Sequence, residues 1–551
     1  HPVLTQESRV ALTLRVVGGL STDEIAKAFL VPKSTVAQRI VRAKKTLAGV
    51  AFEVPDRSEW PQRMATVLSV IYLIFNEGYA ASSGRLWFRE ELCAEALRLG
   101  RVLAALACTV GLAATAVAAT RPVDVVFGTY VLDTATHATR AIVLVATLLL
   151  LALCGDTVAG HRRETEFVVL VQLGALGSIL LGGAADLILL FAAFLLASVP
   201  LYALAGWAKQ GTAPEAALKY YLAGALAGVT TVAGVTLLFG TAGATGYDAV
   251  ADGIASGPGG AAAVGLIAVL VGLAFKAGAV PAHFWVPDVA DGTPPAVAAV
   301  ITTLPKIGAL VATYRLLDTA VPADVVDWPL IIAILAAVSM TLGNLAAFAQ
   351  TSVLRLLGYS TISQVGYMLM ALAVAGRAPL AQPALLFYLA AYAITNIAAF
   401  AVVAATGQRT LAGHRGLFRR DPPLAIALVV ALLGLVGTPP TAVFLGKLVV
   451  FTATVDGGLV WLVALAVVNT VASLFYYLRW IAPAFGEPGP DHERPVTRAR
   501  GWARGTALGA AALSLLLGEN PGAIPRGAPL DRLTPPPIPD GLPADLLRRR
   551  P

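Results

Sequence analysis

Charged side chains are scarce in this chain. Asp, Glu, Lys and Arg make up 13% of its 551 residues, whereas hydrophobic residues make up 57% and the mean hydropathy is +0.75. This balance excludes an ordinary water-soluble globular protein for the chain as a whole. Apolar runs of about 18 residues or more recur between Val102 and Leu517, each long enough to cross a bilayer as a helix. The sequence therefore predicts a membrane protein with many spans.

Cysteine is rare as well. Cys93, Cys108 and Cys154 are far apart and form no CxxC pair, which excludes a disulfide framework, an iron–sulfur cluster and a zinc site. We therefore expect this chain to bind no metal and no cofactor. The chain begins at His1, and no basic-then-apolar signal peptide opens it, which leaves a fragment or a processed product as alternatives.

The sequence divides into unlike parts. Residues 1–101 are charged and helical by pattern, residues 102–520 alternate apolar helices with short loops, and residues 521–551 form a Pro-rich tail expected to be disordered. Thirteen spans are predicted in the apolar part: 103–120, 138–154, 166–183, 185–206, 217–240, 261–280, 295–317, 328–349, 357–375, 383–405, 423–453, 458–480 and 503–518.

The basic residues of the loops give the orientation. With a cytoplasmic amino terminus and a carboxyl terminus outside, the outer loops hold only Arg121, Arg140 and Arg377. The cytoplasmic loops hold the others: Arg162, Arg163, Lys209, Arg355, Arg409, Arg415, Arg419, Arg420, Arg494, Arg498 and Arg500. This asymmetry satisfies the positive-inside rule.

The first fifty residues have the pattern of a helix-turn-helix. Leu4–Val17 is predicted as a helix, and Ser21 with Glu24 forms a capping box that opens a second helix. After the turn at 31–33, Ser34 is expected to cap a third helix, 35–47, where positive charge could meet phosphates. The alternative to phosphate binding is that this helix simply exposes its basic residues to solvent. The basic residues are Lys33, Arg39, Arg42, Lys44 and Lys45.

The string ESRVALTLRVVGGLSTDEIAKAFLVPKSTVAQRIVRAKKTL closely resembles region four of extracytoplasmic-function sigma factors. VLSVIYLIFNEGYAAS and ELCAEALRLGRVLAAL resemble their carboxyl-terminal extension, so we assign 1–50 to the helix-turn-helix and 51–101 to the extension. Ile71–Phe75 is too short to span and is expected to be a soluble core helix. The resemblance implies promoter DNA and RNA polymerase as partners, but the family's region two is absent, so transcription initiation is not expected. The matching recognition positions are Ser34, Thr35, Gln38 and Arg39.

Four lysines lie in or beside the apolar helices. An ionisable residue there costs on the order of 3 kcal/mol on insertion scales, so each is a functional candidate unless it can snorkel. Lys219 has Glu215 four residues before it and could either pair with it or snorkel. Lys276, Lys306 and Lys447 lie beside interruptions of the apolar helices by Gly and Pro.

Such interruptions free backbone groups at membrane depth, which is tolerated only against protein or a watery cavity. Paired interrupted helices in a transporter indicate an ion site near the midplane. A desolvated lysine exchanges its proton readily, so a chain of these amines could carry protons. His283 and Gln364 could extend the path, although a lone histidine near a helix end is as often interfacial.

The segments EAALKYYLAGALAG, GLAFKAGAVPAHFWVPDVADGTPP, LGYSTISQVGYML and GTPPTAVFLGKLVVF resemble subunit N of the proton-pumping NADH:quinone oxidoreductase, an antiporter-like subunit of respiratory complex I. The resemblance covers about Val102 to Leu517. It implies two inverted five-helix repeats, each with a broken helix, and a lysine-lined axis. By motif, the family's proton-path lysines are Lys219, Lys276, Lys306 and Lys447.

Three departures from the family pattern stand out. The family's first helix is replaced by the sigma-like part, which leaves thirteen spans. Leu195 stands where the family has the glutamate that pairs with the first lysine, and Gln364 stands where it has a histidine.

The predicted fold is all-α: a polytopic bundle of about thirteen spans preceded by a small soluble helix-turn-helix domain. The predicted function is proton translocation as a membrane-arm subunit of NADH:quinone oxidoreductase in the bacterial inner (plasma) membrane. NADH, flavin, iron–sulfur clusters and quinone are expected in partner subunits. The alternatives are a cation/proton antiporter subunit, a membrane-tethered DNA-binding regulator and a non-functional gene fusion.

Overall fold

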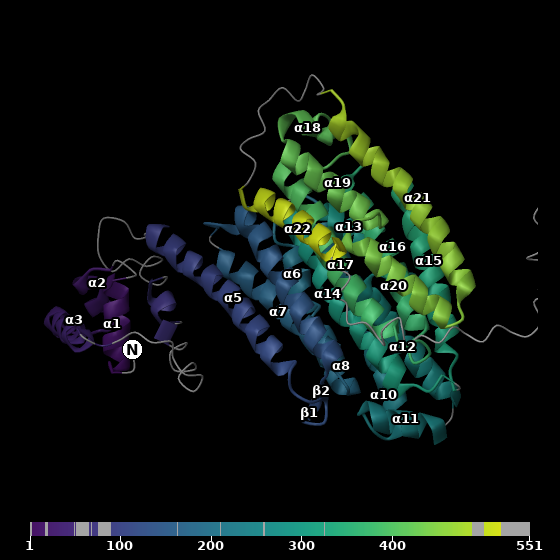
Figure 1. The fold of residues 1–551 in the computed structure, drawn as a ribbon. Helices are drawn as coiled ribbons and strands as arrows, with labels where there is room; N and C mark the ends of the chain where they lie inside the picture. The colour runs from purple at the N-terminus through teal and green to yellow at the C-terminus, as the bar shows by residue number, and fades with distance from the viewer. Residues whose placement is uncertain are drawn as a thin grey trace, which may run out of the picture.

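The structure is a computed structural model of the chain. It describes residues 3–16, 20–48, 50, 66–67, 69–74, 90–161, 163–209, 211–256, 259–323, 325–487 and 501–519. The predicted Pro-rich tail and the loop arginines Arg162, Arg494, Arg498 and Arg500 lie outside the described residues. A small helical module at the amino terminus stands beside a large bundle of long helices (Figure 1).

The amino-terminal module consists of α1 (Gln6–Val16), α2 (Thr22–Ala28) and α3 (Lys33–Leu47) around an apolar core that includes Leu14, Ile25 and Val36. The capping box of Ser21 and Glu24 is present. The prediction that Ser34 caps the third helix is wrong. The helix begins earlier, because the Pro32 carbonyl already accepts the amides of residues 35 and 36, and no side chain caps it.

The predicted soluble helix around Ile71 belongs to this core. Residues 69–74 are helical, and Val70 and Ile74 are buried in the same cluster as the side chains of α1 to α3. Phe75 lies outside the described residues.

Helix α5 (Glu90–Ala118) joins the two parts of the chain. It runs without a break across the predicted domain boundary at residues 101 and 102. Near its start, Leu99 packs on the core of the amino-terminal module, and Arg101 forms an ion pair with Glu164 at the start of α7. The first span therefore begins inside the soluble module.

A short hairpin of β1 (Asp124–Val126) and β2 (Tyr130–Leu132) follows α5. The first half of the bundle then contains α6 (Thr134–Val158), α7 (Glu164–Gly183), α8 (Leu187–Leu196), α9 (Val199–Ala205), α10 (Ala213–Ala242), α11 (Tyr247–Ser256), α12 (Gly259–Ala277), α13 (Trp285–Gly292) and α14 (Pro295–Arg315), which ends in a π-helical turn, Leu316–Ala320.

The second half of the bundle contains α15 (Trp328–Phe348), α16 (Val353–Ala373), α17 (Ala381–Thr406), a 3₁₀ turn (Ala412–His414), α18 (Leu417–Arg420), α19 (Pro422–Val436), α20 (Ala442–Asp456), α21 (Val460–Phe485) and α22 (Gly501–Glu519). The described residues are thus helical apart from the hairpin, isolated bridges and loops, which agrees with the all-α prediction.

Eleven helices of the described part are long and apolar enough to cross a membrane. They match the predicted spans except for the last and for 423–453, which consists of the two shorter helices α19 and α20. The last predicted span coincides with α22, which is not among the eleven.

Helices α14, α16 and α17 form the centre of the bundle. In their most apolar stretches 100%, 94% and 89% of the residues are buried, against 11% for α5. A helix that is buried on all sides cannot turn its polar residues toward lipid or water. Polar side chains on these three helices must therefore find partners inside the protein.

Arg315 and Asp133 form a largely buried ion pair beside the hairpin. Arg315, at the end of α14, donates two hydrogen bonds of 2.8 Å to the carboxylate of Asp133, the N-cap of α6. Burial alone would raise the pKa of the Asp133 carboxyl, but hydrogen bonds from Arg315 and Thr136 outweigh it and hold that pKa below its ordinary value of 3.8.

We expect Asp133→Ala to lower the unfolding free energy by about 3 kcal/mol, because it leaves the Arg315 guanidinium buried without its counter-charge. Thermal unfolding of the chain in detergent measures the loss. The pair's contribution is complete above the ordinary pKa of the carboxyl and disappears as the pH falls through the lower folded-state pKa. Wild type and variant should therefore converge in strong acid.

Asp124→Ala, which removes an exposed carboxylate from the same hairpin, is the control and should change stability by no more than about 0.5 kcal/mol. Equal losses in the two variants would contradict a specific role for the Asp133 pair.

Candidate functional site

The first interrupted helix lies between α12 and α13. Gly278 ends α12 with a φ of +79°, a conformation that side chains disfavour, and residues 278–284 form no helix. Two carbonyls at this break accept hydrogen bonds from side chains. Trp285 Nε1 donates to Phe275 O at 3.2 Å, and Lys306 Nζ donates to Ala277 O at 2.6 Å.

Lys306 is fully buried in α14 and lies directly against this break. A Cβ at Gly278 would come within 2.9 Å of the Lys306 amine, so a side chain there would force the amine to shift. The sequence predicted a lysine beside an interrupted helix, and the interruption that Lys306 contacts belongs to a different helix.

The second interrupted helix lies between α19 and α20 and repeats this arrangement. Gly437 ends α19 with a φ of +87°. Gln364 Nε2 donates to Leu435 O at 2.7 Å, and Lys447 Nζ donates to Val436 O at 2.8 Å. The Lys447 amine also contacts Thr470 Oγ1 and lies 3.9 Å from the centre of the Tyr367 ring. Both breaks therefore end with a carbonyl bound by a buried lysine.

Lys276 makes the same kind of contact at a third helix end. Its buried amine donates to the carbonyl of Ala197, the C-cap of α8, at 3.2 Å and contacts the hydroxyl of Ser198. Leu195, at the position of the family's glutamate, is 41% exposed. In the part of the chain that the structure describes, no ion pair involves Lys276, Lys306 or Lys447. Neutral oxygens hold all three amines.

A row of polar groups starts one helical turn from Lys306. Thr302 and Thr303 in α14 accept hydrogen bonds from Asn396 Nδ2 in α17 at 3.2 and 3.0 Å. One turn away on α17, Tyr392 Oη bonds to the Thr302 carbonyl and to Thr361 in α16. The polar groups thus pass from α14 through α17 to α16.

The row continues to the second break through Gln364. Gln364 follows Thr361 by one turn, accepts a 2.6 Å hydrogen bond from Tyr388 Oη and donates to Leu435 O. The next carbonyl, Val436 O, is bound by Lys447. Hydrogen bonds and single helical turns therefore connect the surroundings of Lys306 with those of Lys447.

Of the neutral residues in this row, sequence reasoning named Gln364 but missed Asn396, Tyr388 and Tyr392. It also missed Ser198, which contacts Lys276. A polar residue within an apolar helix was the available signal, as for Asn396 in ITNIAAF, but it does not reveal which neighbouring helix supplies the partner.

Lys219 differs from the other three lysines, because it is not buried. Its side chain is 48% exposed and lies 2.8 Å from Glu215 and 2.9 Å from Asp288. The pairing with Glu215 expected from the spacing is present. The reason for the exposure is that Lys219 lies near the start of α10, beside a polar pocket of about 110 Å³ that Arg355 also lines.

His283 lies half-buried in the loop between α12 and α13. None of the described hydrogen bonds joins it to Lys276 or Lys306. Lys306 therefore contacts the helix end at this break, whereas His283 lies in the loop of the break without a hydrogen bond to either lysine.

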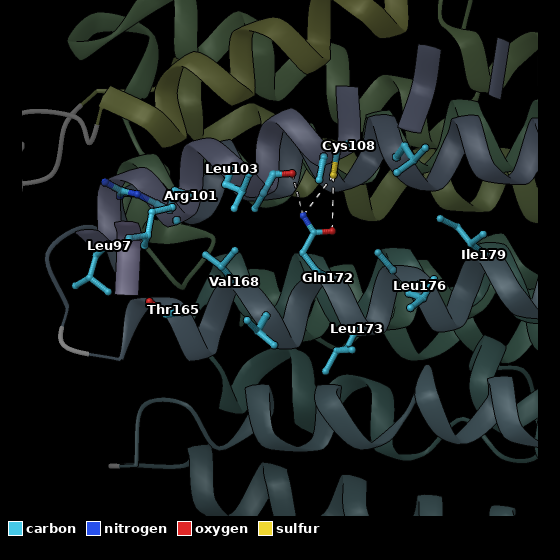
Figure 2. A pocket seen from close by; sticks show the side chains of 17 residues that line it. Leu97, Arg101, Leu103, Cys108, Thr165, Val168, Gln172, Leu173, Leu176 and Ile179 are labelled. Atoms are coloured by element: carbon cyan, nitrogen blue, oxygen red, sulfur yellow. Dashed lines mark hydrogen bonds between the residues drawn. The ribbon is translucent and has the colours of Figure 1, made fainter. Parts of the chain in front are cut away.

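A large groove of the described part lies away from the lysines. It lies between α5 and α7 and has a volume of about 540 Å³. Figure 2 shows that mainly apolar side chains line it. Its central polar groups satisfy each other, because Gln172 Nε2 donates to Ala104 O and contacts Cys108 Sγ. None of the candidate lysines lines this groove, so it offers no proton chemistry.

The candidate DNA contacts lie on α3. Lys33, Ser34, Gln38 and Arg42 are exposed, whereas Thr35 and Arg39 are half-buried. Arg39 forms an ion pair of 2.7 Å with Glu7 of α1, and Lys33 lies 3.8 Å from Asp23.

Residues 184–473 match the family model described as NADH:quinone oxidoreductase/Mrp antiporter, transmembrane. This defines the class of protein, a multi-pass membrane protein of the antiporter-like type. The chain is 74% identical over 423 residues to NADH-quinone oxidoreductase subunit N 1 of Streptomyces griseus, covering 77% of this chain and 90% of that protein. It is 52% identical to the subunit N of Mycobacterium sp. strain JLS, covering 71% and 83%. The chain belongs to the family of NADH-quinone oxidoreductase subunit N.

Solved structures agree with this assignment. Respiratory complex I from Thermus thermophilus with bound aureothin contains a chain that is 34% identical, with a TM-score of 0.68 and coverage of 83% of this chain and 98% of that one. The Mrp complex from Dietzia sp. DQ12-45-1b matches with a TM-score of 0.71 at 22% identity, covering 84% and 94%, which shows a shared fold.

The amino-terminal residues match other families. Residues 2–47 match the model of Sigma-70 region 4, and residues 63–120 match a family of unknown function. Both resemblances inferred from the motifs, to sigma region four and to subunit N, are thus confirmed.

We expect Gln364→Leu to lower the unfolding free energy by about 2 to 4 kcal/mol, because it leaves the Tyr388 hydroxyl and the Leu435 carbonyl buried and unpaired. Thermal unfolding in detergent measures the change. Gln350→Leu is the matched control, because that amide bonds only within the end of its own helix. A loss no larger than in the control would contradict the pairing.

Proposed function

We propose that this chain carries protons through Lys276, Lys306 and Lys447 as a membrane-arm subunit of NADH:quinone oxidoreductase. The observation that carries the proposal is the set of three buried amines, each bound to the carbonyl at a helix end and none to a carboxylate. Membership of the subunit N family supports the enzyme context.

The chemistry follows from the partners. Burial disfavours the charged form of a lysine, and a neutral oxygen stabilises an ammonium less than a carboxylate does. An amine held only by carbonyl and hydroxyl oxygens therefore gains or releases a proton in response to a modest change in nearby charge. A carboxylate partner would fix the charged form instead.

The proposed route runs from Lys276 to Lys306 and then along the row of polar groups to Lys447. Thr302, Asn396 and Tyr392 lead from α14 into α17 and α16. Gln364 leads to the break that Lys447 binds. Hydroxyl groups relay protons by rotating, and waters would bridge gaps longer than about 3.5 Å.

Lys219 and Glu215 are assigned a supporting role, as is His283 in the loop of the first break. Lys219 and Glu215 form part of the exposed pocket at the start of α10, where they are placed to exchange protons with water. NADH, flavin, iron–sulfur clusters and quinone belong to partner subunits in this proposal. The location is the bacterial inner membrane, with a cytoplasmic amino terminus and the carboxyl terminus outside.

We expect Lys306→Ala and Lys276→Ala each to lower proton transfer at least tenfold, because each removes a buried amine that binds the carbonyl at a helix end. The measurement is NADH-driven acidification in vesicles that contain the assembled complex. Lys209→Gln, a change in an exposed loop, is the control. Unchanged proton transfer in assembled Lys306→Ala complexes would overturn the route.

A cation/proton antiporter subunit is the nearest alternative, and the shared fold with the Mrp complex is compatible with it. Purification of the chain from its native membrane separates the two functions. Redox subunits that copurify with the chain support the oxidoreductase, whereas their absence together with sodium-dependent proton exchange supports the antiporter.

A second function, DNA binding by the amino-terminal module, is favoured by the match to Sigma-70 region 4 and by the exposed basic face of α3. The candidate contacts remain Lys33, Ser34, Thr35, Gln38, Arg39 and Arg42. RNA polymerase is the corresponding protein partner.

We expect the full chain in nanodiscs to bind duplex DNA with an affinity that falls steeply as salt rises. Arg42→Ala should weaken binding severalfold, because Arg42 is exposed on the recognition helix. Fluorescence anisotropy of labelled DNA measures both effects. Arg15→Ala on α1 is the control, and absence of salt-dependent binding removes this function.

A further inference from the structure

A small cavity lies where α17 ends and α19 begins, away from the lysines. It has a volume of about 170 Å³ and is lined by Ala405, Thr406, Gln408, Leu417, Arg420, Asp421 and Leu424. A water molecule occupies about 30 Å³ of liquid, so this space holds several waters or one tetrahedral anion. Since α17 and α19 are apolar helices, their ends mark the level of the lipid headgroups.

Arg420 contributes a donor that nothing in the described residues satisfies. Its Nη2 donates to Arg415 O at 2.8 Å, but its Nε is buried and has no hydrogen-bond partner. A buried guanidinium N–H without an acceptor is costly, because a charged donor loses more from desolvation than a neutral one. Arg420 is also one of the residues that line the cavity, so an acceptor in that space lies beside the same side chain.

The charges around the cavity favour an anion. Arg420 and Asp421 are the charged residues that line the cavity, and Arg504 pairs with Asp421, so these three side chains leave an excess of one positive charge. Asp421 is already held by Arg504 through hydrogen bonds of 2.9 and 3.2 Å. These hydrogen bonds, against the opposing effect of burial, hold the pKa of the Asp421 carboxyl below its ordinary value. Its charge is therefore engaged away from Arg420.

The remaining polar neighbours add little charge. Burial lowers the pKa of His414 to about 4, so this imidazole is neutral at pH 7 and bonds to Thr410 and Thr406. The carboxyl end of α17 presents a partial negative charge and the amino end of α19 a partial positive one, so the two helix ends roughly offset each other. The arginines therefore supply the attraction.

We propose that this cavity binds a phosphate group through Arg420. Guanidinium groups match phosphate oxygens in geometry as well as charge. The position at the ends of two apolar helices suits the headgroup of an anionic phospholipid, and free phosphate presents the same chemistry. The proposal is independent of proton transfer.

The test uses the full chain, delipidated in neutral detergent. Native mass spectrometry counts retained phosphatidylglycerol, with phosphatidylcholine as the zwitterionic comparison, and equilibrium dialysis measures inorganic phosphate. We expect one phosphatidylglycerol to be retained and Arg420→Gln to weaken its binding at least tenfold. Arg419→Gln removes the same charge from the adjacent, exposed position and should change binding less than twofold.

Equal weakening in the two variants would show attraction by net charge alone and would overturn the site. Absence of any bound phosphate compound would overturn it as well. Binding of inorganic phosphate with the same dependence on Arg420, but not of phosphatidylglycerol, supports the site and assigns it to free phosphate. If Arg420→Gln does not fold, Arg420→Lys, which keeps the charge but lacks Nε–H, should weaken binding severalfold.

Discussion

A helix that stops inside a membrane leaves carbonyl oxygens with no water to bind them, and in this protein lysine amines bind those oxygens. Lys276, Lys306 and Lys447 each donate to a carbonyl at a helix end: Ala197, Ala277 and Val436. An unsatisfied backbone group at this depth costs several kcal/mol, and so does an unpaired ammonium. Each contact satisfies both groups at once. The interruptions and the lysines therefore depend on one another.

This dependence explains the arrangement of the surrounding helices. Helices α14, α16 and α17 are almost wholly buried, so the polar residues on them satisfy each other across helix boundaries. Lipid-facing helices such as α10 place their charges near their ends instead, as Lys219 does. A row of polar groups through the bundle requires helices that touch protein on every side, and the centre of this bundle supplies them.

Hydropathy and composition predicted most of the fold, because a helix of about 20 apolar residues has few alternatives in a bilayer. The lysines beside Gly and Pro interruptions also followed from the sequence. The partners did not. That Lys306 binds the end of α12, and Gln364 the end of α19, depends on packing between helices that are far apart in sequence. The predicted start of α3 was too late. The carbonyl of Pro32, two residues before Ser34, already accepts the amides of residues 35 and 36.

The absence of a carboxylate partner changes what this chain can do by itself. Where a lysine pairs with an acid in the same chain, moving the acid switches the proton affinity of the amine. The resemblance assigns the acid at the position of Leu195 to the first lysine, Lys219, which in this chain pairs with Glu215 and Asp288 instead. Lys276 has no carboxylate partner among the described residues and contacts the hydroxyl of Ser198. A hydroxyl carries no net charge, so its movement changes the electrostatic potential at the amine only slightly. If protons move through these lysines, the charge that drives them must come from outside the three amine sites. The exposed cluster around Lys219 and Asp288, or a neighbouring subunit, is the available source. Proton transfer is then a property of the assembled complex rather than of the isolated chain.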